Sequence, residues 1–212
     1  PSISSTDEPI AAKLGEMSSE VSVLLASSRH FGDLTGTTSI KVMYLLGQYD
    51  EAFHVCRQLQ RSMLWAGGAT PHVSEYVLYK GLTAAAIAQR SRGGARRDGL
   101  RRLTRSIRRM QRYAQNAPSN FQHLTYLLRA ERAWLRASHA RALDLYESAA
   151  ARAEADGFPN HLALIRERLS DLQSSLGRRA ESAEMRRRAI AGYEAWGAHA
   201  KVAQLTRSSL RS

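Results

Sequence analysis

The chain has 212 residues, 43% of them hydrophobic, and is therefore long enough to bury a core in one or two domains. Its net charge of +12 comes mostly from arginine, which favours an acidic protein surface or a nucleic acid as partner. The single cysteine excludes an internal disulfide, and no apolar run reaches the roughly 20 residues of a membrane span. These features indicate a cytoplasmic protein with no membrane contact.

The N-terminal region is expected to differ from the rest of the chain. The sequence begins at Pro1 rather than at Met, which indicates a fragment with residues missing before it. Residues 1–9 are polar and are predicted to form a disordered tail. Apolar residues at helical spacing then predict a helix over 10–30 that ends near Gly32. An exposed apolar face on this helix would favour a homodimer.

From Thr37 onward, helical periodicity and turn residues predict four antiparallel helical hairpins, followed by a further helix after Gly197. The predicted hairpins cover residues 37–66, 72–115, 120–156 and 160–196. Their central turns lie 40 to 47 residues apart. This spacing is closer to that of long helical repeats than to the roughly 34 residues of a standard tetratricopeptide unit.

Two of the predicted helices share one pattern of side chains, at steps of 0, 3, 4, 7 and 11 residues. The first set is Ala52, Val55, Cys56, Leu59 and Met63, and the second, ninety residues later, is Ala142, Leu145, Tyr146, Ala149 and Ala153. Each set lines one side of a helix. The repeat predicts an all-α fold, a right-handed solenoid of about nine to ten helices that forms one domain over residues 10–212.

Several motifs resemble known helical repeats. Residues 47–52 resemble the inter-helix turn of tetratricopeptide repeats, where a small residue such as Ala52 lets two helices approach closely. Five further segments are similar to the helical region of large bacterial signalling proteins, and the Trp-Gly-Ala-x-Ala-Lys-Val ending is the most distinctive part. These segments are 117–121, 127–131, 142–146, 153–158 and 193–202.

In that family, a serine/threonine-kinase-like domain and a nucleotide-binding signal-transduction ATPase precede the helices, and a sensor histidine kinase often follows. The resemblance implies a tetratricopeptide-like regulatory module that binds a partner protein or neighbouring domains of the same polypeptide. It carries over no catalytic residue, because the kinase and ATPase motifs of the family lie in segments outside this sequence.

A search for reactive motifs predicts no catalytic, cofactor or metal site. The sequence contains no phosphate-binding Gly-x-x-x-x-Gly-Lys-Ser/Thr loop, no histidine pair at helical zinc spacing and no Gly-x-Ser-x-Gly elbow. Cys56 occupies the repeat position that Tyr146 fills later, which favours a buried structural thiol. Glu131 lies on the apolar side of its predicted helix, where a salt bridge between hairpins would stabilise it.

The candidate binding residues are five arginines on one arc of the helix predicted over 96–115. They are Arg97, Arg101, Arg105, Arg108 and Arg112. Arg102 and Arg109 widen the arc, and Asp98 is the acidic residue nearest to it. Such a stripe can contact phosphates or dock on an acidic domain, or it can be a solvated face in an arginine-rich protein. Single-strand binding would also need interleaved aromatics, and Tyr113 is the aromatic residue nearby.

The favoured interpretation is a non-catalytic interaction module of a cytoplasmic signalling protein, linked to a kinase or ATPase or to transcriptional control. Its concave surface, lined by the first helix of each hairpin, is expected to hold a partner segment. The alternative is a nucleic-acid-binding helical-repeat domain that uses the Arg-rich face 97–112. An enzyme is the third and least favoured class.

Overall fold

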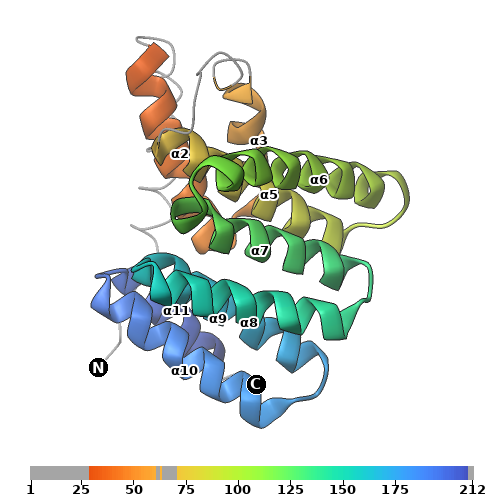
Figure 1. The fold of residues 1–212 in the computed structure, drawn as a ribbon, viewed down its shortest axis with the longest axis vertical. Coiled ribbons are helices and arrows are strands. Elements are labelled where there is room, and N and C mark those ends of the chain that lie inside the picture. Colours follow the sequence, from red (N-terminus) through yellow and green to blue (C-terminus); the bar gives the residue numbers. More distant parts are fainter. Residues whose placement is uncertain (1–28, 61–62, 64–70, 210–212) are drawn as a thin grey trace, which may run out of the picture.

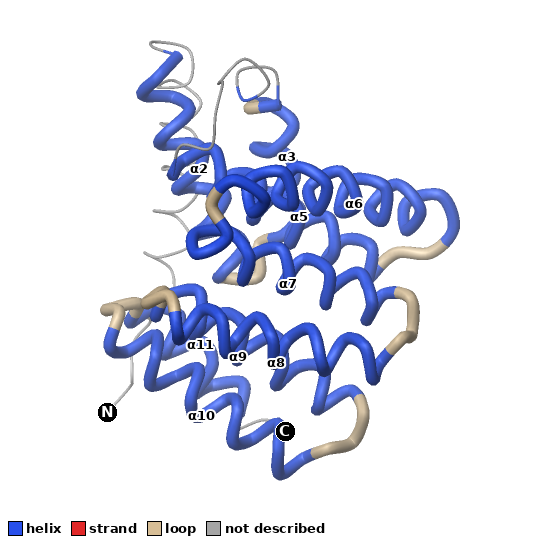
Figure 2. Tube along the Cα trace, viewed as in Figure 1, coloured by secondary structure: helices blue, strands red, loops and turns tan. Residues whose placement is uncertain are grey.

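A computed structural model describes residues 29–60, 63 and 71–209 of the chain. These residues form nine α-helices and no strand. Figure 2 shows the helices and the loops that join them. The described helices are α2 (Arg29–Leu45), α3 (Tyr49–Gln58), α5 (Pro71–Arg90), α6 (Gly93–Asn116), α7 (Pro118–Leu135), α8 (His139–Ala155), α9 (Pro159–Ser175), α10 (Arg179–Ala195) and α11 (His199–Ser209). The predicted tail over 1–9 and nearly all of the predicted helix over 10–30 lie outside the described residues.

Successive helices pair and stack. α2 packs on α3, α5 on α6, α7 on α8 and α9 on α10, and each pair also contacts the next. Figure 1 shows the pairs following one another along the long axis of the molecule. This arrangement confirms the predicted all-α solenoid of helix hairpins.

The turns between helices repeat one backbone motif. After α2, α7, α8, α9 and α10, one residue adopts a positive φ, and the next backbone N–H donates to the carbonyl five residues earlier. Glycine occupies the positive-φ position in four of these turns, and Ala137, with φ of 57°, occupies it after α7. The bond satisfies carbonyl groups that a helix end leaves unpaired. The chain therefore reverses direction in the same way at each of these five points.

The predicted helix end near Gly32 is wrong, because α2 continues through Gly32 and Gly36 to Leu45. A Cβ atom at Gly36 would lie 2.7 Å from Cδ1 of Leu59. The absence of a side chain at this position lets α2 approach the chain just after α3. Glycine here serves close packing and does not end the helix.

Both copies of the repeated side-chain pattern line the core. All five residues of the first copy are buried, and so are four of the second, whereas Leu145 is half-buried. Tyr146 and Cys56 occupy equivalent positions with different partners. The Tyr146 hydroxyl donates to the Glu131 carboxylate at 2.7 Å, and the Cys56 carbonyl accepts from the Tyr76 hydroxyl at 3.1 Å.

A buried ion pair joins two hairpins in the interior of the solenoid. Arg168 on α9 donates through Nε and Nη2 to the two carboxylate oxygens of Glu131 on α7, at 2.7 and 3.1 Å. Its Nη1 donates to Asp171 at 2.8 Å, and its guanidinium lies over the Trp134 ring. This bidentate geometry satisfies both charges without water. The salt bridge predicted for Glu131 is confirmed.

The last described helix closes the stack against the first. The Lys201 ammonium on α11 donates to the Leu45 carbonyl at 2.7 Å and pairs with Glu167 on α9 at 2.6 Å. Gln204 donates to the Leu46 carbonyl at 3.0 Å. These side chains satisfy carbonyl groups at the end of α2, where a cation is also favoured by the helix dipole.

The concave surface, expected from the sequence to hold a partner segment, contains buried aromatic and charged side chains. Tyr44, Tyr79, Glu131, Arg168 and Lys201 come from the first helices of the successive pairs and from α11, and all five are buried. Their hydrogen bonds and ion pairs fill the interior with protein contacts. Space for a ligand must be sought at the edges of this interior.

We expect Arg168→Met to lower the free energy of unfolding by about 3–5 kcal/mol, because it leaves the Glu131 carboxylate buried without its cation. Adding Glu131→Met should recover part of this loss, since the unpaired charge is then removed. Urea unfolding at pH 7 measures both effects. Arg166→Met is the control: its partner Glu154 is largely exposed, so it should cost less than about 1 kcal/mol. Equal losses in the two single variants would contradict the prediction.

Candidate functional site

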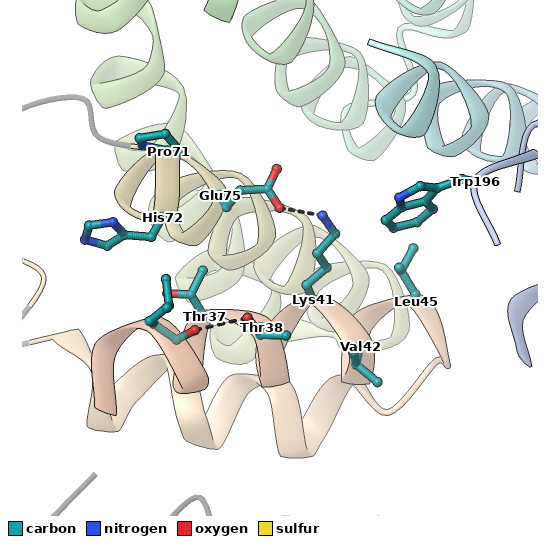
Figure 3. Close-up of a pocket in the computed structure, with 10 residues that line it drawn as sticks. Thr37, Thr38, Lys41, Val42, Leu45, Pro71, His72, Glu75 and Trp196 are labelled. Atoms are coloured by element: carbon teal, nitrogen blue, oxygen red, sulfur yellow. Dashed lines mark hydrogen bonds and ion pairs between the residues drawn. The ribbon is translucent and has the colours of Figure 1, made fainter. Parts of the chain in front are cut away.

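A groove lies between α2, the first turns of α5 and the turn that joins α10 to α11. Figure 3 shows Lys41 reaching across it between Glu75 and Trp196. The groove encloses about 420 Å³. Its lining residues are Leu34, Thr37, Thr38, Lys41, Val42, Leu45, Pro71, His72, Glu75 and Trp196. A second cavity of about 580 Å³ shares Val42, Leu45 and Trp196 and continues along residues 197–201.

Large exposed apolar side chains are concentrated at this groove. Among the described residues, Leu34 is 55% exposed and Trp196 is 40% exposed, and both line it. The other large apolar side chains of the described part are buried or half-buried. Exposed aromatic and aliphatic groups at one cavity are typical of a surface that contacts another molecule.

Trp196 takes its position from the end of α10. It is the residue that follows α10, and its indole lies 6.3 Å from the Tyr193 ring and 5.0 Å from the Lys41 ammonium. Its indole is only partly covered by these neighbours. The cation above the ring holds the side chain at the edge of the groove.

A chain of four polar side chains runs from the interior into the groove. His123 Nε2 lies 2.9 Å from His161 Nδ1, and His161 Nε2 lies 2.9 Å from Glu75 Oε1. The Lys41 ammonium donates to Glu75 Oε2 at 2.9 Å. These contacts form if each histidine carries its proton on Nε2 and donates it toward the carboxylate, whereas His123 Nδ1 is buried without a partner among the described residues. The four side chains thereby connect α7, α9, α5 and α2. Their spacing along the sequence did not predict this connection.

The environments of these groups shift their pKa values in definite directions. Burial raises the pKa of Glu75, but the hydrogen bond from His161 and the charge of Lys41 outweigh it, so the pKa lies below its usual value. Burial and the neighbouring His161 lower the pKa of His123 to about 3. His123 is therefore neutral near pH 7. In the described part of the chain, no cluster of histidine, cysteine or carboxylate side chains could hold a metal ion.

The five arginines predicted as a binding surface all lie on α6 and are exposed. Arg102 and Arg109, which widen the arc, are half-buried. Arg102 pairs with Asp98 at 2.6 Å, and Arg109 donates to the Tyr113 hydroxyl at 2.7 Å. The arginine face lies on α6, whereas α2, α5 and the α10–α11 turn form the groove. The two surfaces are therefore separate parts of the molecule.

Cys56 is buried in the core of the first hairpin. Desolvation raises the pKa of its thiol to about 12, although the charges of Lys80 and Arg102 oppose the shift. The thiolate form is scarce at neutral pH, so the thiol is a poor nucleophile. This environment agrees with the structural role expected for Cys56.

No family model and no curated protein matches this chain. Among solved structures, it is similar to PlcR of Bacillus thuringiensis, in a crystal structure of the complex with the peptide PapR7 and DNA. The two chains are 13% identical, with a TM-score of 0.59, and the match covers 92% of this chain and 68% of PlcR. This likeness supports the helical-repeat fold. In the described part, no helix has both the length and the apolar character to cross a membrane.

We predict that His123 makes stability fall between pH 6.5 and pH 3. Its pKa is about 3 in the folded protein and about 6.5 when unfolded, so the unfolded state binds the proton first as pH falls. The free energy of unfolding should decrease by about 1.4 kcal/mol per pH unit in this window. His123→Gln can still donate a hydrogen bond to His161. Between pH 7 and pH 4.5, its free energy of unfolding should fall by about 2–3 kcal/mol less than that of the native chain. Equal acid sensitivity of both proteins in urea titrations would contradict this.

We also predict that Cys56 resists alkylation in the folded chain. At pH 8, its thiol should react with iodoacetamide at least about a hundredfold more slowly than in the urea-unfolded chain, because both burial and the raised pKa protect it. Mass spectrometry of samples quenched over time measures the two rates. Comparable rates would show that the thiol is accessible.

Proposed function

We propose that this chain is a non-catalytic regulatory module that binds a short segment of a partner protein in the groove of α2, α5 and the α10–α11 turn. The observation that carries the proposal is the location of Leu34 and Trp196, the exposed large apolar side chains, at this one cavity. Protein interfaces draw most of their binding energy from a few such anchors, and tryptophan is among the most frequent.

The side chains of the groove indicate which kind of partner segment would bind there. An apolar side chain of the partner can pack between Leu34 and the Trp196 indole and displace water from both. The Lys41–Glu75 pair on the floor offers a cation and a carboxylate to polar groups that flank this anchor. The similarly folded PlcR is in complex with the peptide PapR7, which supports a peptide as the ligand class to test.

The wider context of the module is also proposed. We infer that it belongs to a larger cytoplasmic signalling protein that contains kinase-like and ATPase domains or controls transcription. The similarity of residues 193–202 to such proteins supports this context, and the same segment contributes Trp196 to the groove. An open reading frame that encodes a kinase-like, ATPase or DNA-binding domain in the same polypeptide would support it, and a reading frame without any of these domains would contradict it.

We expect peptides selected from a random display library on the full chain to bind through Trp196. Replacing Trp196 with Ala should weaken a selected peptide about thirtyfold or more, as loss of an interface hot spot of about 2 kcal/mol does. Fluorescence anisotropy of the labelled peptide measures the affinities. The selected sequences should share an aromatic or aliphatic residue at one position.

The matched control is Leu176→Ala. Leu176 is a half-buried apolar residue that lines a different cavity, formed by α8 and the α9–α10 turn. This variant should bind the peptides as the native chain does. The proposal fails if selection yields no binder above background, or if Trp196→Ala and Leu176→Ala have the same effect while both variants keep the native circular dichroism spectrum.

A further inference from the structure

A continuous basic surface extends over three neighbouring helices. α6 contributes the five exposed arginines Arg97, Arg101, Arg105, Arg108 and Arg112. α7 adds Arg129 and Arg132, Arg136 follows directly after α7, and α8 adds Arg141. α6 packs on α7 and α7 on α8, and Figure 1 shows the three helices as adjacent layers. We call these nine residues the basic surface.

Arg132 lies at the centre of this surface. Burial lowers the pKa of its guanidinium, and the charges of Arg136, Arg129, Arg141 and Arg108 lower it further. The charges of arginines from α6, α7 and α8 thus act together on Arg132. Among the described residues, none of these five arginines forms an ion pair, so their mutual repulsion is not relieved within the fold. An anion bound between them would relieve it.

Other arginines of α6 are already used by the fold, which sets the basic surface apart from a general arginine excess. Arg96 donates to the carbonyls of Ala88 and Leu135, and Arg109 donates to the Met63 carbonyl. Arg102 forms the pair with Asp98, which Arg101 also approaches at 3.4 Å. The contacts of Arg96 and Arg109 hold α6 against its neighbours, whereas the pairs with Asp98 lie within α6. The other outward arginines are available to a ligand.

We propose that the basic surface docks the phosphate backbone of a duplex nucleic acid without reading its bases. From Arg97 to Arg112, α6 advances about 22 Å, and two helix separations of about 8–10 Å give a similar width. An area of this size spans several phosphates of a nucleic acid, far more than a single small anion offers. Guanidinium groups suit this ligand because their planar donors match phosphate oxygens.

Two features favour a duplex over the other polyanions. A protein partner would be expected to use apolar anchors, but the exposed large apolar side chains of the described part lie at the groove instead. A single strand would be expected to stack its bases on aromatic rings. Tyr113 and Tyr126, the tyrosines of α6 and α7, are half-buried against the core, and Tyr113 also binds Arg109.

The test measures binding of the full chain to a labelled 20-base-pair DNA duplex of mixed sequence, between 50 and 200 mM salt. Arg108→Ala/Arg132→Ala should weaken binding roughly a hundredfold near 0.1 M salt, about tenfold for each lost phosphate contact. The slope of log affinity against log salt should become shallower by about 2. Arg105→Gln/Arg108→Gln, two exposed positions, gives the same test if the first variant does not fold.

The matched control is Arg178→Ala/Arg179→Ala, which removes the same net charge from exposed positions at the α9–α10 turn. It should change the affinity less than threefold. An equal loss in control and test variants would overturn the proposal, because binding would then follow net charge alone. Tighter binding to a single strand or to polyglutamate than to the duplex would also overturn it, the latter result assigning the surface to an acidic protein.

Discussion

The ion pair between Glu131 and Arg168 is the interaction on which the interior of this protein depends. It joins α7 to α9 across the concave side of the stack, and Tyr146 from α8 donates to the same carboxylate. A carboxylate that is 2% exposed is tolerable only because its lone pairs are occupied by well-placed donors. The pair therefore fixes the relative position of successive helix pairs as well as neutralising a charge.

A buried charged group with well-placed hydrogen-bond partners also closes the stack at its ends. Lys201 on α11 satisfies a terminal carbonyl of α2 and the Glu167 carboxylate, so the first and last described helices are tied together. These contacts close the stack between α2 and α11 in the described part of the chain. The groove lies at the junction of α2, α5 and the α10–α11 turn, at the edge of this contact between α2 and α11. Lys41 and Trp196 border the groove there.

The groove and the basic surface differ in the interactions that they offer. The groove presents apolar side chains around one ion pair, so association there would bury apolar area and depend weakly on salt. The basic surface presents guanidinium groups from three helices, most of them without an ion pair among the described residues, and would act through charge, with strong salt dependence. Because the two surfaces lie on different helices, occupation of one leaves the other free.

The sequence by itself determined the helices, the turns and much of the core, because these depend on local spacing and on the conformational preference of single residues. The repeated face from Ala52 to Met63 predicted a buried side of a helix, and glycines such as Gly47 and Gly177 marked turns that require positive φ. Glu131 on an apolar face predicted a salt bridge between hairpins, although its partner Arg168 could not be named. The five exposed arginines of α6 were predicted in the same way, from the spacing of residues around a helix.

Only the tertiary structure decided which contacts form between distant segments of the chain. The link from His123 through His161 and Glu75 to Lys41 joins residues up to 86 positions apart, and Lys201 contacts a carbonyl 156 positions earlier. The packing of Leu59 on Gly36 likewise explains why a glycine lies within α2. Such contacts depend on how the hairpins twist and close, which the spacing of residues along one helix does not encode. The groove arises from that closure, so its position could not be read from the sequence.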